Sequence, residues 1–213
     1  ITSQTALIFP IKEICKIAKS RGIITIIDGA HAPGHINLDI TQIGCDYYTG
    51  ACHKWMCAPK GSSFLYVAKN FQKGMSPQIM SWGEEGDDPG PSQFLMDFQW
   101  QGTKDMSAFL AIPSAIRFLQ KNKWKEKSVI SKNLISRLAG RLKHILGTES
   151  LFKNKDWIGQ MISHPLPTNS PINLKDILWN DFKIEVPIFE WKKRNFIRVS
   201  AHFYNDQKAV SYT

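Results

Sequence analysis

The feature that most constrains this fold is an amphipathic helix pattern that passes directly into a short apolar strand. Residues 10–21, PIKEICKIAKSR, place their apolar side chains on one helical stripe, from Pro10 in the first turn to Gly22 just past the end. Residues 23–27, IITII, are apolar on both faces and rich in β-branched side chains, which predicts a strand of a parallel sheet buried on both faces. A helix followed at once by such a strand indicates α/β layering.

Polar side chains appear where this strand ends, in the stretch DGAHAPGH. Asp28 is the first polar residue after the apolar run, and His31 follows three positions later. Because ligands bind beyond the carboxyl ends of strands in open α/β sheets, we expect both residues at a functional site. The alternative is that Asp28 only initiates the turn DGA.

Two further strands are predicted over residues 45–50 and 61–69, after a short helix or turn at 36–44. The tight segment between the two strands, ACHKWMCAPK, carries Lys54. Its position predicts a side chain directed toward the same sheet edge as Asp28. A bland surface role for the lysine remains the alternative.

The middle of the chain is loop-rich over residues 70–102 and includes an acidic stretch, SWGEEGDDPGP, at 81–91. Long irregular segments in compact domains are often functional loops. The motif WQGTKD then precedes a helical pattern at 106–122, which predicts Thr103 at a helix start, where backbone N–H groups favour an anion. A simple N-cap is the alternative role for Thr103.

The C-terminal part has a different composition. Residues 121–144 predict a helix with a basic, solvated face, and 161–171 (MISHPLPTNSP) predict a proline-broken connection. Two strands are predicted over 183–189 and 196–204, which together indicate a small α+β domain. Arg198 alternates with apolar neighbours in the second strand. This pattern is compatible with a surface arginine on a strand edge, which is the alternative to any functional role for Arg198.

The positive net charge suggests nucleic-acid binding, but the distribution of the charges and the absence of binding motifs argue against it. The 213 residues carry a formal net charge of +9, but the lysines are scattered and no zinc finger, RNA-binding signature or arginine-rich arm is present. No apolar run approaches the ~20 residues needed to cross a bilayer. We therefore expect neither a nucleic-acid nor a membrane partner.

The cysteines do not form a metal-binding pattern. Their spacings give no paired C-x-x-C knuckles, so we expect no metal site. Buried free thiols in a reducing cytoplasm explain them better. The four residues are Cys15, Cys45, Cys52 and Cys57.

Four motifs in order, IIDGAHAPG, HKWMCAPKG, WQGTKD and IRVSAHFYN, resemble the class V aminotransferase family of pyridoxal-phosphate enzymes. Within that family they are most similar to the isopenicillin N epimerase-like branch. The resemblance runs from Ile1 to about Asn205. It implies a fold type I α/β protein: residues 1–120 form the back part of the cofactor-binding large domain, with a mainly parallel sheet and helices, and 121–213 form a small α+β C-terminal domain. The family's N-terminal part lies upstream of the matched segment.

The resemblance also implies roles for residues near the cofactor ring. Lys54 would hold the aldehyde of pyridoxal 5′-phosphate as a Schiff base and move the proton at the substrate Cα. Asp28 would pair with the pyridine nitrogen and keep it protonated. His31 would hydrogen-bond the ring hydroxyl.

Further roles concern the phosphate and the substrate. His53 would lie near the cofactor phosphate, and Thr103 would bind that phosphate from the neighbouring subunit, which implies a homodimer with shared active sites. Arg198 would bind the substrate α-carboxylate in a bidentate fork. Ala51 departs from the family pattern, because relatives usually carry a polar, phosphate-holding residue there.

Together these observations predict a cytoplasmic pyridoxal-phosphate enzyme that acts at the Cα of an amino-acid or peptide substrate. Epimerase-, lyase- and aminotransferase-like reactions stay open. A desulfurase is disfavoured, because no cysteine follows Cys57. The alternatives are a non-catalytic fragment or degenerate homologue that serves as a dimerisation or binding domain and, from the charge alone, a nucleic-acid-binding protein.

Overall fold

The computed structural model describes residues 1–84 and 90–205. The chain divides into two compact units, and each is made of segments that are separate in sequence. Unit 1 comprises Ile1–Pro10, His31–Leu38 and Ile116–Thr213, and unit 2 comprises Ile11–Ala30 and Asp39–Ala115. The division into domains at residue 120 stays a prediction.

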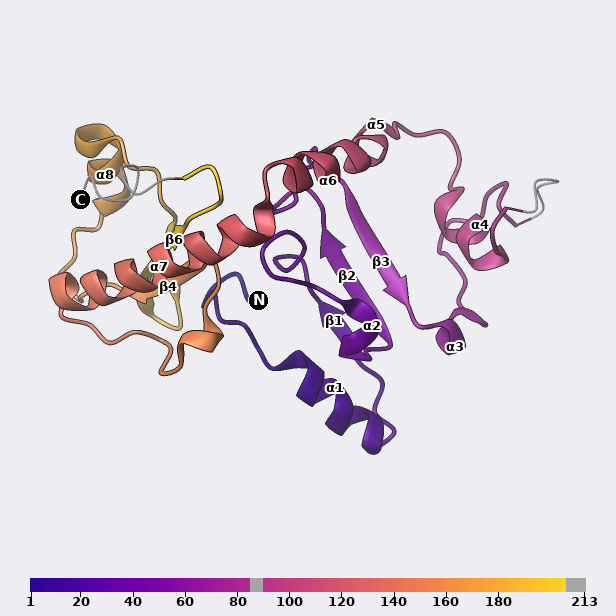
Figure 1. Cartoon of the computed structure of the whole chain (residues 1–213), viewed down its shortest axis with the longest axis horizontal. Coiled ribbons are helices and arrows are strands. Elements are labelled where there is room, and N and C mark those ends of the chain that lie inside the picture. The colour runs from indigo at the N-terminus through magenta and orange to yellow at the C-terminus, as the bar shows by residue number, and fades with distance from the viewer. Residues whose placement is uncertain (85–89, 206–213) are drawn as a thin grey trace. The chain divides into compact units, whose positions relative to one another are not determined.

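Unit 2 is built on a three-stranded sheet in the order β1-β2-β3 (Figure 1). Helix α1 (Ile11–Ser20) leads into β1 (Ile26–Asp28), which pairs in parallel with β2 (Tyr47–Ala51). Strand β3 (Ser63–Val67) then returns antiparallel to β2. The expected helix, the three strands and the parallel β1–β2 pair are confirmed, and the sheet as a whole is mixed.

The expected burial of the first strand on both faces is wrong. Ile24 is 57% exposed and Ile26 is 74% exposed. The physical reason is the position of β1 at the sheet edge, with a strand on one side only among the described residues. Its other apolar side chain, Ile27, pairs with the fully buried Tyr48 and is half-buried.

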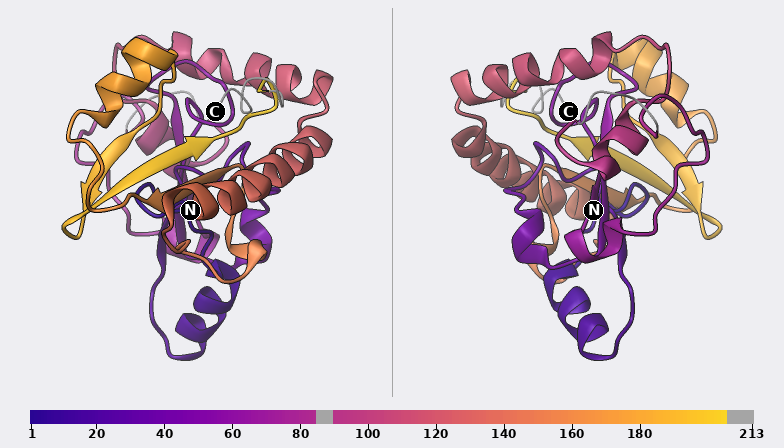
Figure 2. Two further views of the ribbon diagram at one scale, coloured as in Figure 1. Left: turned by 90° about the vertical axis from the view of Figure 1, so that its left-hand side faces the viewer. Right: turned by 90° about the vertical axis from the view of Figure 1, so that its right-hand side faces the viewer.

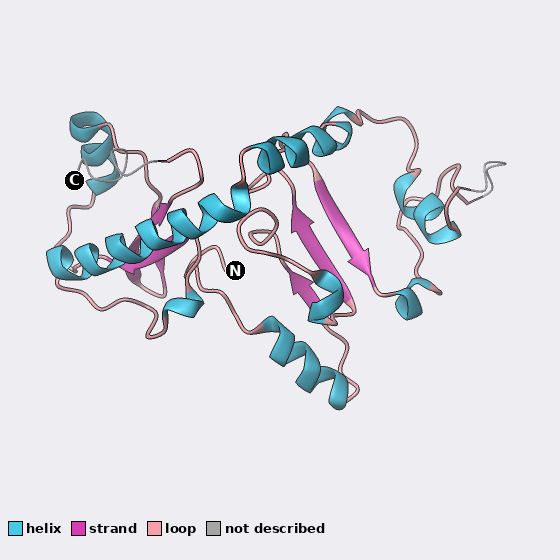
Figure 3. Ribbon diagram, in the orientation of Figure 1, coloured by secondary structure: helices cyan, strands magenta, loops and turns pink. Residues whose placement is uncertain are grey.

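The remaining helices of unit 2 are short, and long loops connect them (Figure 3). The predicted 36–44 element is α2, which Asp39 caps through a hydrogen bond from the Gln42 amide. The loop-rich region does contain two helices, α3 and α4, and the acidic stretch at 81–91 lies partly outside the described residues. The bounds are α2 (Ile40–Ile43), α3 (Lys69–Gln72) and α4 (Gln93–Gln99).

The helical pattern predicted over residues 106–122 forms two helices instead of one. Helix α5 (Ser107–Leu110) ends just before α6 (Ile112–Lys121) begins. Pro113 lies in the first turn of α6, where a missing N–H is tolerated, whereas its ring is incompatible with a helix continuing from the preceding turn. The proline therefore explains the break.

Unit 1 is an antiparallel sheet in the order β4-β6-β5 with the long helix α7 beside it (Figure 2). Leu134, Ile135 and Ala139 of α7 pack in one buried cluster with Ile162 of β4 and with Ile158. The expected small α+β domain is thus confirmed in its elements. Their bounds are α7 (Trp124–Leu146), the 3-10 helix η1 (Lys155–Trp157), β4 (Met161–Pro165), α8 (Leu174–Phe182), β5 (Ile188–Trp191) and β6 (Arg194–Ser200).

The proline-broken connection expected over 161–171 is wrong in its first half, which forms β4. All five β4 side chains are buried, and the strand pairs antiparallel with β6. Pro165 ends this strand, and β4 is an edge strand of its sheet, where a missing donor is tolerated. Strands β5 and β6 are joined at Lys192 and Lys193, both with positive φ (49° and 60°), as in a type I′ hairpin turn.

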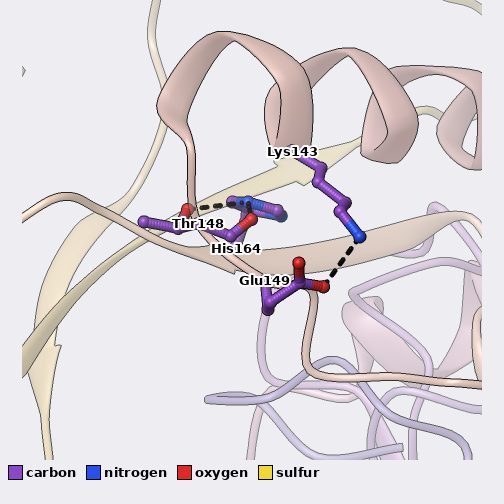
Figure 4. Close-up of polar contacts among 4 residues, drawn as sticks. All are labelled: Lys143, Thr148, Glu149 and His164. Carbon is purple, nitrogen blue, oxygen red and sulfur yellow. Dashed lines mark hydrogen bonds and ion pairs between the residues drawn. The ribbon is translucent and has the colours of Figure 1, made fainter.

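A polar cluster attaches the end of α7 to β4 (Figure 4). The buried His164 ring places Nε2 3.0 Å from the Thr148 hydroxyl and 3.2 Å from the Thr148 carbonyl oxygen. The same hydroxyl donates to the Pro165 carbonyl at 2.7 Å. Burial lowers the pKa of His164, which favours the neutral ring. At the surface, Lys143 and Glu149 form an ion pair at 2.8 Å.

Candidate functional site

The carboxyl ends of β1 and β2 meet at one edge of the unit 2 sheet, because the two strands are parallel. Asp28 ends β1 and pairs with Thr49 of β2. Strand β2 ends at Ala51, and His53 and Lys54 follow it directly. The fold therefore brings the carboxylate of Asp28 and the loop that carries the lysine to the same sheet edge, as the sequence pattern predicts. Both side chains are exposed.

Asp28 also performs the local role considered as its alternative. Its Oδ1 accepts a hydrogen bond from the Ala30 amide at 3.0 Å, so it does stabilise the turn. This bond uses one carboxylate oxygen and orients the other. A structural role in the turn and a role toward a ligand are thus compatible.

The glycine after Asp28 fixes how β1 ends. Gly29 donates its N–H to the Thr49 carbonyl at 2.9 Å, which extends the strand pairing by one bond. A Cβ at this position would lie 2.0 Å from the ring of the buried Tyr48. Only glycine permits this close approach, and the sequence pattern DGA alone signals a turn without revealing the aromatic ring beneath it.

Lys54 lies on a short loop that is anchored at both ends. The Cys52 amide donates to the Ser62 carbonyl, and the Ala58 amide donates to the Cys52 carbonyl, both at 3.0 Å. Cys52 and Ala58 are buried in one cluster with Ala115 of α6. The backbone of the loop is therefore held against the core, while Lys54 itself is exposed.

His53 is oriented by a backbone carbonyl. Its Nδ1 lies 3.1 Å from the Ser62 carbonyl oxygen, so Nδ1 carries a proton and donates. Ser62 is fully buried, and its own hydroxyl donates to Pro59 at 2.7 Å. The ring is thus held through Nδ1, and Nε2 is the nitrogen left to contact a ligand. The bond spans nine residues, and no local pattern in the sequence predicts it.

Thr103 does not lie at a helix start, so its predicted position and its alternative role as an N-cap are wrong. The next helix, α5, begins at Ser107 after the flanking residue Met106. Asp105 rather than Thr103 satisfies the first amide, since its Oδ1 accepts the Ser107 N–H at 2.8 Å. Thr103 is exposed in the preceding turn. Its predicted contact with a cofactor phosphate stays a prediction.

His31 belongs to unit 1, where it precedes a buried histidine that the sequence analysis did not single out. His35 Nε2 accepts the Gln160 backbone N–H at 2.7 Å, and the Gln160 side-chain amide donates to the His35 carbonyl at 2.7 Å. Burial, with the nearby charge of His31, lowers the pKa of His35 to about 3. The ring stays neutral, as an acceptor requires. The two residues are 125 positions apart, so their pairing leaves no signal in the sequence.

Arg198 is on the central strand of the unit 1 sheet, so its alternative role as a strand-edge arginine is wrong. Its Nη1 donates to the carbonyl and to the hydroxyl of Ser3, both at 2.8 Å. Burial lowers the pKa of Arg198, and within the described residues no carboxylate pairs with it. Because a half-buried cation is costly unless it is paired, this guanidinium is suited to bind an anion.

Three of the cysteines are buried free thiols, and Cys57 is exposed, contrary to the expectation for it. Among residues 1–84 and 90–205 no three histidine, cysteine or acidic side chains group as metal ligands would. A pocket of about 200 Å³ lies beside α8, lined by Lys175, Trp179 and Glu185 among others, and includes none of the predicted site residues. No helix in the described part of the chain is both long and apolar enough to cross a membrane.

The family model described as Aminotransferase class-V matches residues 1–212. This chain belongs to the class V aminotransferase family. Among curated members, isopenicillin N epimerase from Amycolatopsis lactamdurans is 34% identical over 99% of this chain and 56% of its own length. A probable chloroplastic L-cysteine desulfhydrase from Arabidopsis thaliana is 29% identical over 89% of this chain and 41% of its length. The chain thus spans about half the length of the relatives it matches.

Solved structures share the fold of this chain. The apo cysteine desulfurase from Thermococcus onnurineus NA1 superposes with a TM-score of 0.81 at 22% identity, over 99% of this chain and 55% of that one. A structure described as a C-DES mutant with glycine covalently linked to its PLP cofactor gives a TM-score of 0.79 at 19% identity, over 99% and 56%. At these identities the likeness concerns the fold, and the α/β class predicted from the sequence is confirmed.

Proposed function

We propose that this chain is the lysine-bearing part of a pyridoxal-phosphate enzyme that acts at the Cα of an amino-acid or peptide substrate. The observation that carries the proposal is the joint position of Asp28 and the Lys54 loop at the carboxyl edge of the β1–β2 pair. The side chains there fit the cofactor chemically: an amine for its aldehyde, a carboxylate for its ring nitrogen, and an imidazole for its phosphate. When bound, the cofactor supplies an electron sink for a carbanion at Cα.

Each of these side chains has a defined task in the proposal. The Lys54 amine holds the cofactor and then removes or returns the Cα proton, for which its anchored loop provides a constant position. The Asp28 carboxylate, oriented by the Ala30 amide, keeps a proton on the ring nitrogen. His53 contributes Nε2 toward the phosphate, because Nδ1 is engaged with Ser62.

In unit 1, we assign substrate-carboxylate binding to Arg198 and a contact with the ring hydroxyl to His31. The support for Arg198 is its half-buried guanidinium without a described carboxylate partner. A planar guanidinium binds a carboxylate through two parallel hydrogen bonds, which fixes orientation as well as charge. Thr103 remains assigned to the phosphate of the neighbouring subunit in a homodimer, and the free buried thiols support a cytoplasmic protein.

The reaction class is an epimerase-, lyase- or aminotransferase-like step. The relatives named as isopenicillin N epimerase and L-cysteine desulfhydrase favour the first two. The sequence has no cysteine after Cys57, which disfavours a desulfurase with a cysteine on a later loop.

A second candidate is a non-catalytic dimerisation or binding domain. It is favoured by Ala51, a buried apolar residue where the family usually has a polar one.

Cofactor binding separates the two candidates. Mixed with pyridoxal phosphate, the chain should develop an absorbance band near ~420 nm, and borohydride reduction followed by peptide mapping should place the cofactor on Lys54. Lys54→Ala should abolish both signals. Lys60→Ala, which removes an exposed lysine from the same loop, is the matched control and should retain them. Identical spectra for wild type and Lys54→Ala would exclude the enzyme hypothesis for this chain.

A further inference from the structure

Two buried polar atoms in unit 1 lack hydrogen-bond partners, and they belong to residues that face each other. Ser163 of β4 and Arg198 of β6 are direct partners in the antiparallel register. Among the side chains and backbone that the structure describes, the Ser163 hydroxyl oxygen and the Arg198 Nε are both buried without a partner. Ser163 is only 3% exposed. Directly opposed residues of an antiparallel pair project on the same face, with Cβ atoms about 5 Å apart.

Such a pair of unsatisfied atoms needs an explanation, because buried polar groups are almost always hydrogen-bonded. Nε–H is a donor, and the serine hydroxyl is an acceptor with a rotatable proton. The two groups are therefore chemically complementary. At a Cβ separation of about 5 Å, a change of arginine rotamer is enough to bring them within hydrogen-bonding distance.

The present arginine conformation is fixed by its other end. Arg198 Nη1 donates twice to Ser3, to the carbonyl and to the hydroxyl oxygen, each at 2.8 Å. Ser3 is exposed and offers only neutral acceptors, so a carboxylate competes favourably with it, since charge-assisted hydrogen bonds are about twice as strong as neutral ones.

We propose that Ser163 is a positioning residue for Arg198: its hydroxyl accepts the Nε–H when the guanidinium leaves Ser3, and Nη1 and Nη2 then bind a carboxylate as a fork. This inference rests on the proposed role of Arg198 as the residue that binds the substrate carboxylate. In this proposal Ser163 acts through the arginine and does not contact the carboxylate. The hydrogen bond from Nε–H to Ser163 restricts the orientation of the guanidinium plane. The arginine side chain then loses less conformational entropy when the anion binds.

Arginine Nε–H signals in ¹⁵N NMR spectra of the full chain test this directly, with the Arg198 signal assigned from its loss in Arg198→Lys. Acetate is the probe, and acetamide is its uncharged control. Acetate should shift the Arg198 signal in the wild type, and acetamide should not. Ser163→Ala should weaken acetate binding about tenfold. Ser163→Cys, similar in size but a poor acceptor, should weaken binding likewise and serves if the alanine variant does not fold.

Two controls isolate the hydroxyl. Ser163→Thr keeps it, and Ser131→Ala removes another buried hydroxyl, on α7, so both should bind acetate within about twofold of the wild type. If the hydroxyl has no positioning role, Ser163→Ala should bind acetate as tightly as the wild type. Unchanged binding would overturn the positioning role and leave the role of Arg198 intact. No acetate response at Arg198 in the wild type would overturn both.

Discussion

At the scale of single residues, orientation in this chain comes from backbone groups more than from other side chains. The Ser62 carbonyl holds His53, the Ala30 amide holds Asp28, and the Gln160 amide holds His35. Backbone partners cannot be read from residue identity, which is why the sequence analysis identified Asp28 and Lys54 by their place at strand ends but missed what orients them. It missed His35 entirely, since the partner of that ring is distant in sequence.

The neutral His35 makes stability depend on pH. Its folded pKa, about 3, is below the ordinary 6.5, so below pH 6.5 the unfolded chain takes up a proton that the folded chain refuses. The stabilisation is complete above pH 6.5 and is lost progressively as the pH falls toward 3. Between pH 7 and pH 4 we expect the contribution of His35 to fall by on the order of 3 kcal/mol. Urea unfolding of wild type and His35→Gln at both pH values measures it.

The control for this experiment is His144→Gln, which removes an exposed ring from α7. The difference between wild type and His35→Gln should shrink at pH 4, because the wild type alone carries the penalty of keeping this ring neutral. A difference that is the same at both pH values would contradict the assignment.

At the scale of elements, the spacing of apolar residues predicted most of the helices and strands that form. It failed where burial or a capping side chain determines the structure. Helix α1 and strands β1 to β3 follow from apolar patterns. Two strands were also predicted over 183–189 and 196–204, whereas the structure has β5 at Ile188–Trp191 and β6 at Arg194–Ser200, joined by a turn of two residues. Strand β4 was missed because three prolines within 161–171 suggested a connection, whereas burial of every β4 side chain against β6 and α7 decides the outcome. The position of Thr103 was mistaken because the helix after WQGTKD begins later, at an amide that Asp105 satisfies.

The end of β1 depends on its close approach to β2. Gly29→Ala should destabilise unit 2 by about 1–3 kcal/mol, because the new Cβ would meet the ring of the buried Tyr48. Urea unfolding followed by tryptophan fluorescence measures the change. Gly140→Ala, in the middle of α7 with open space around it, should instead be neutral or stabilise by up to about 1 kcal/mol. Equal effects of the two substitutions would exclude the steric explanation.

At the scale of the whole molecule, the sequence predicted an α/β protein with a small α+β part, and both are present. What it could not predict is the exposure of an apolar strand. The pattern IITII describes a strand suited to burial on both faces, but whether other elements cover it depends on the complete sheet rather than on the strand.

This exposure has a measurable effect on stability. Ile26→Lys should change the free energy of unfolding by less than about 0.5 kcal/mol, because the side chain is 74% exposed, and it should reduce self-association seen by light scattering. Val67→Ala, at a buried position of β3 in the same sheet, is the contrast and should cost about 2 kcal/mol. A large loss of stability in Ile26→Lys would show that this strand is covered in solution.

The order in which the chain contributes to its two units limits how the protein can be dissected. The polypeptide passes from one unit to the other at residues 10/11, 30/31, 38/39 and 115/116. Neither unit can be excised as one continuous stretch. A fragment that starts after residue 115 would keep Gln160 but lose His35, the acceptor of its backbone amide, and Ser3, the anchor of Arg198. Gene truncation would therefore remove interior parts of the unit it aims to isolate, whereas circular permutation or co-expression of complementary pieces would preserve them.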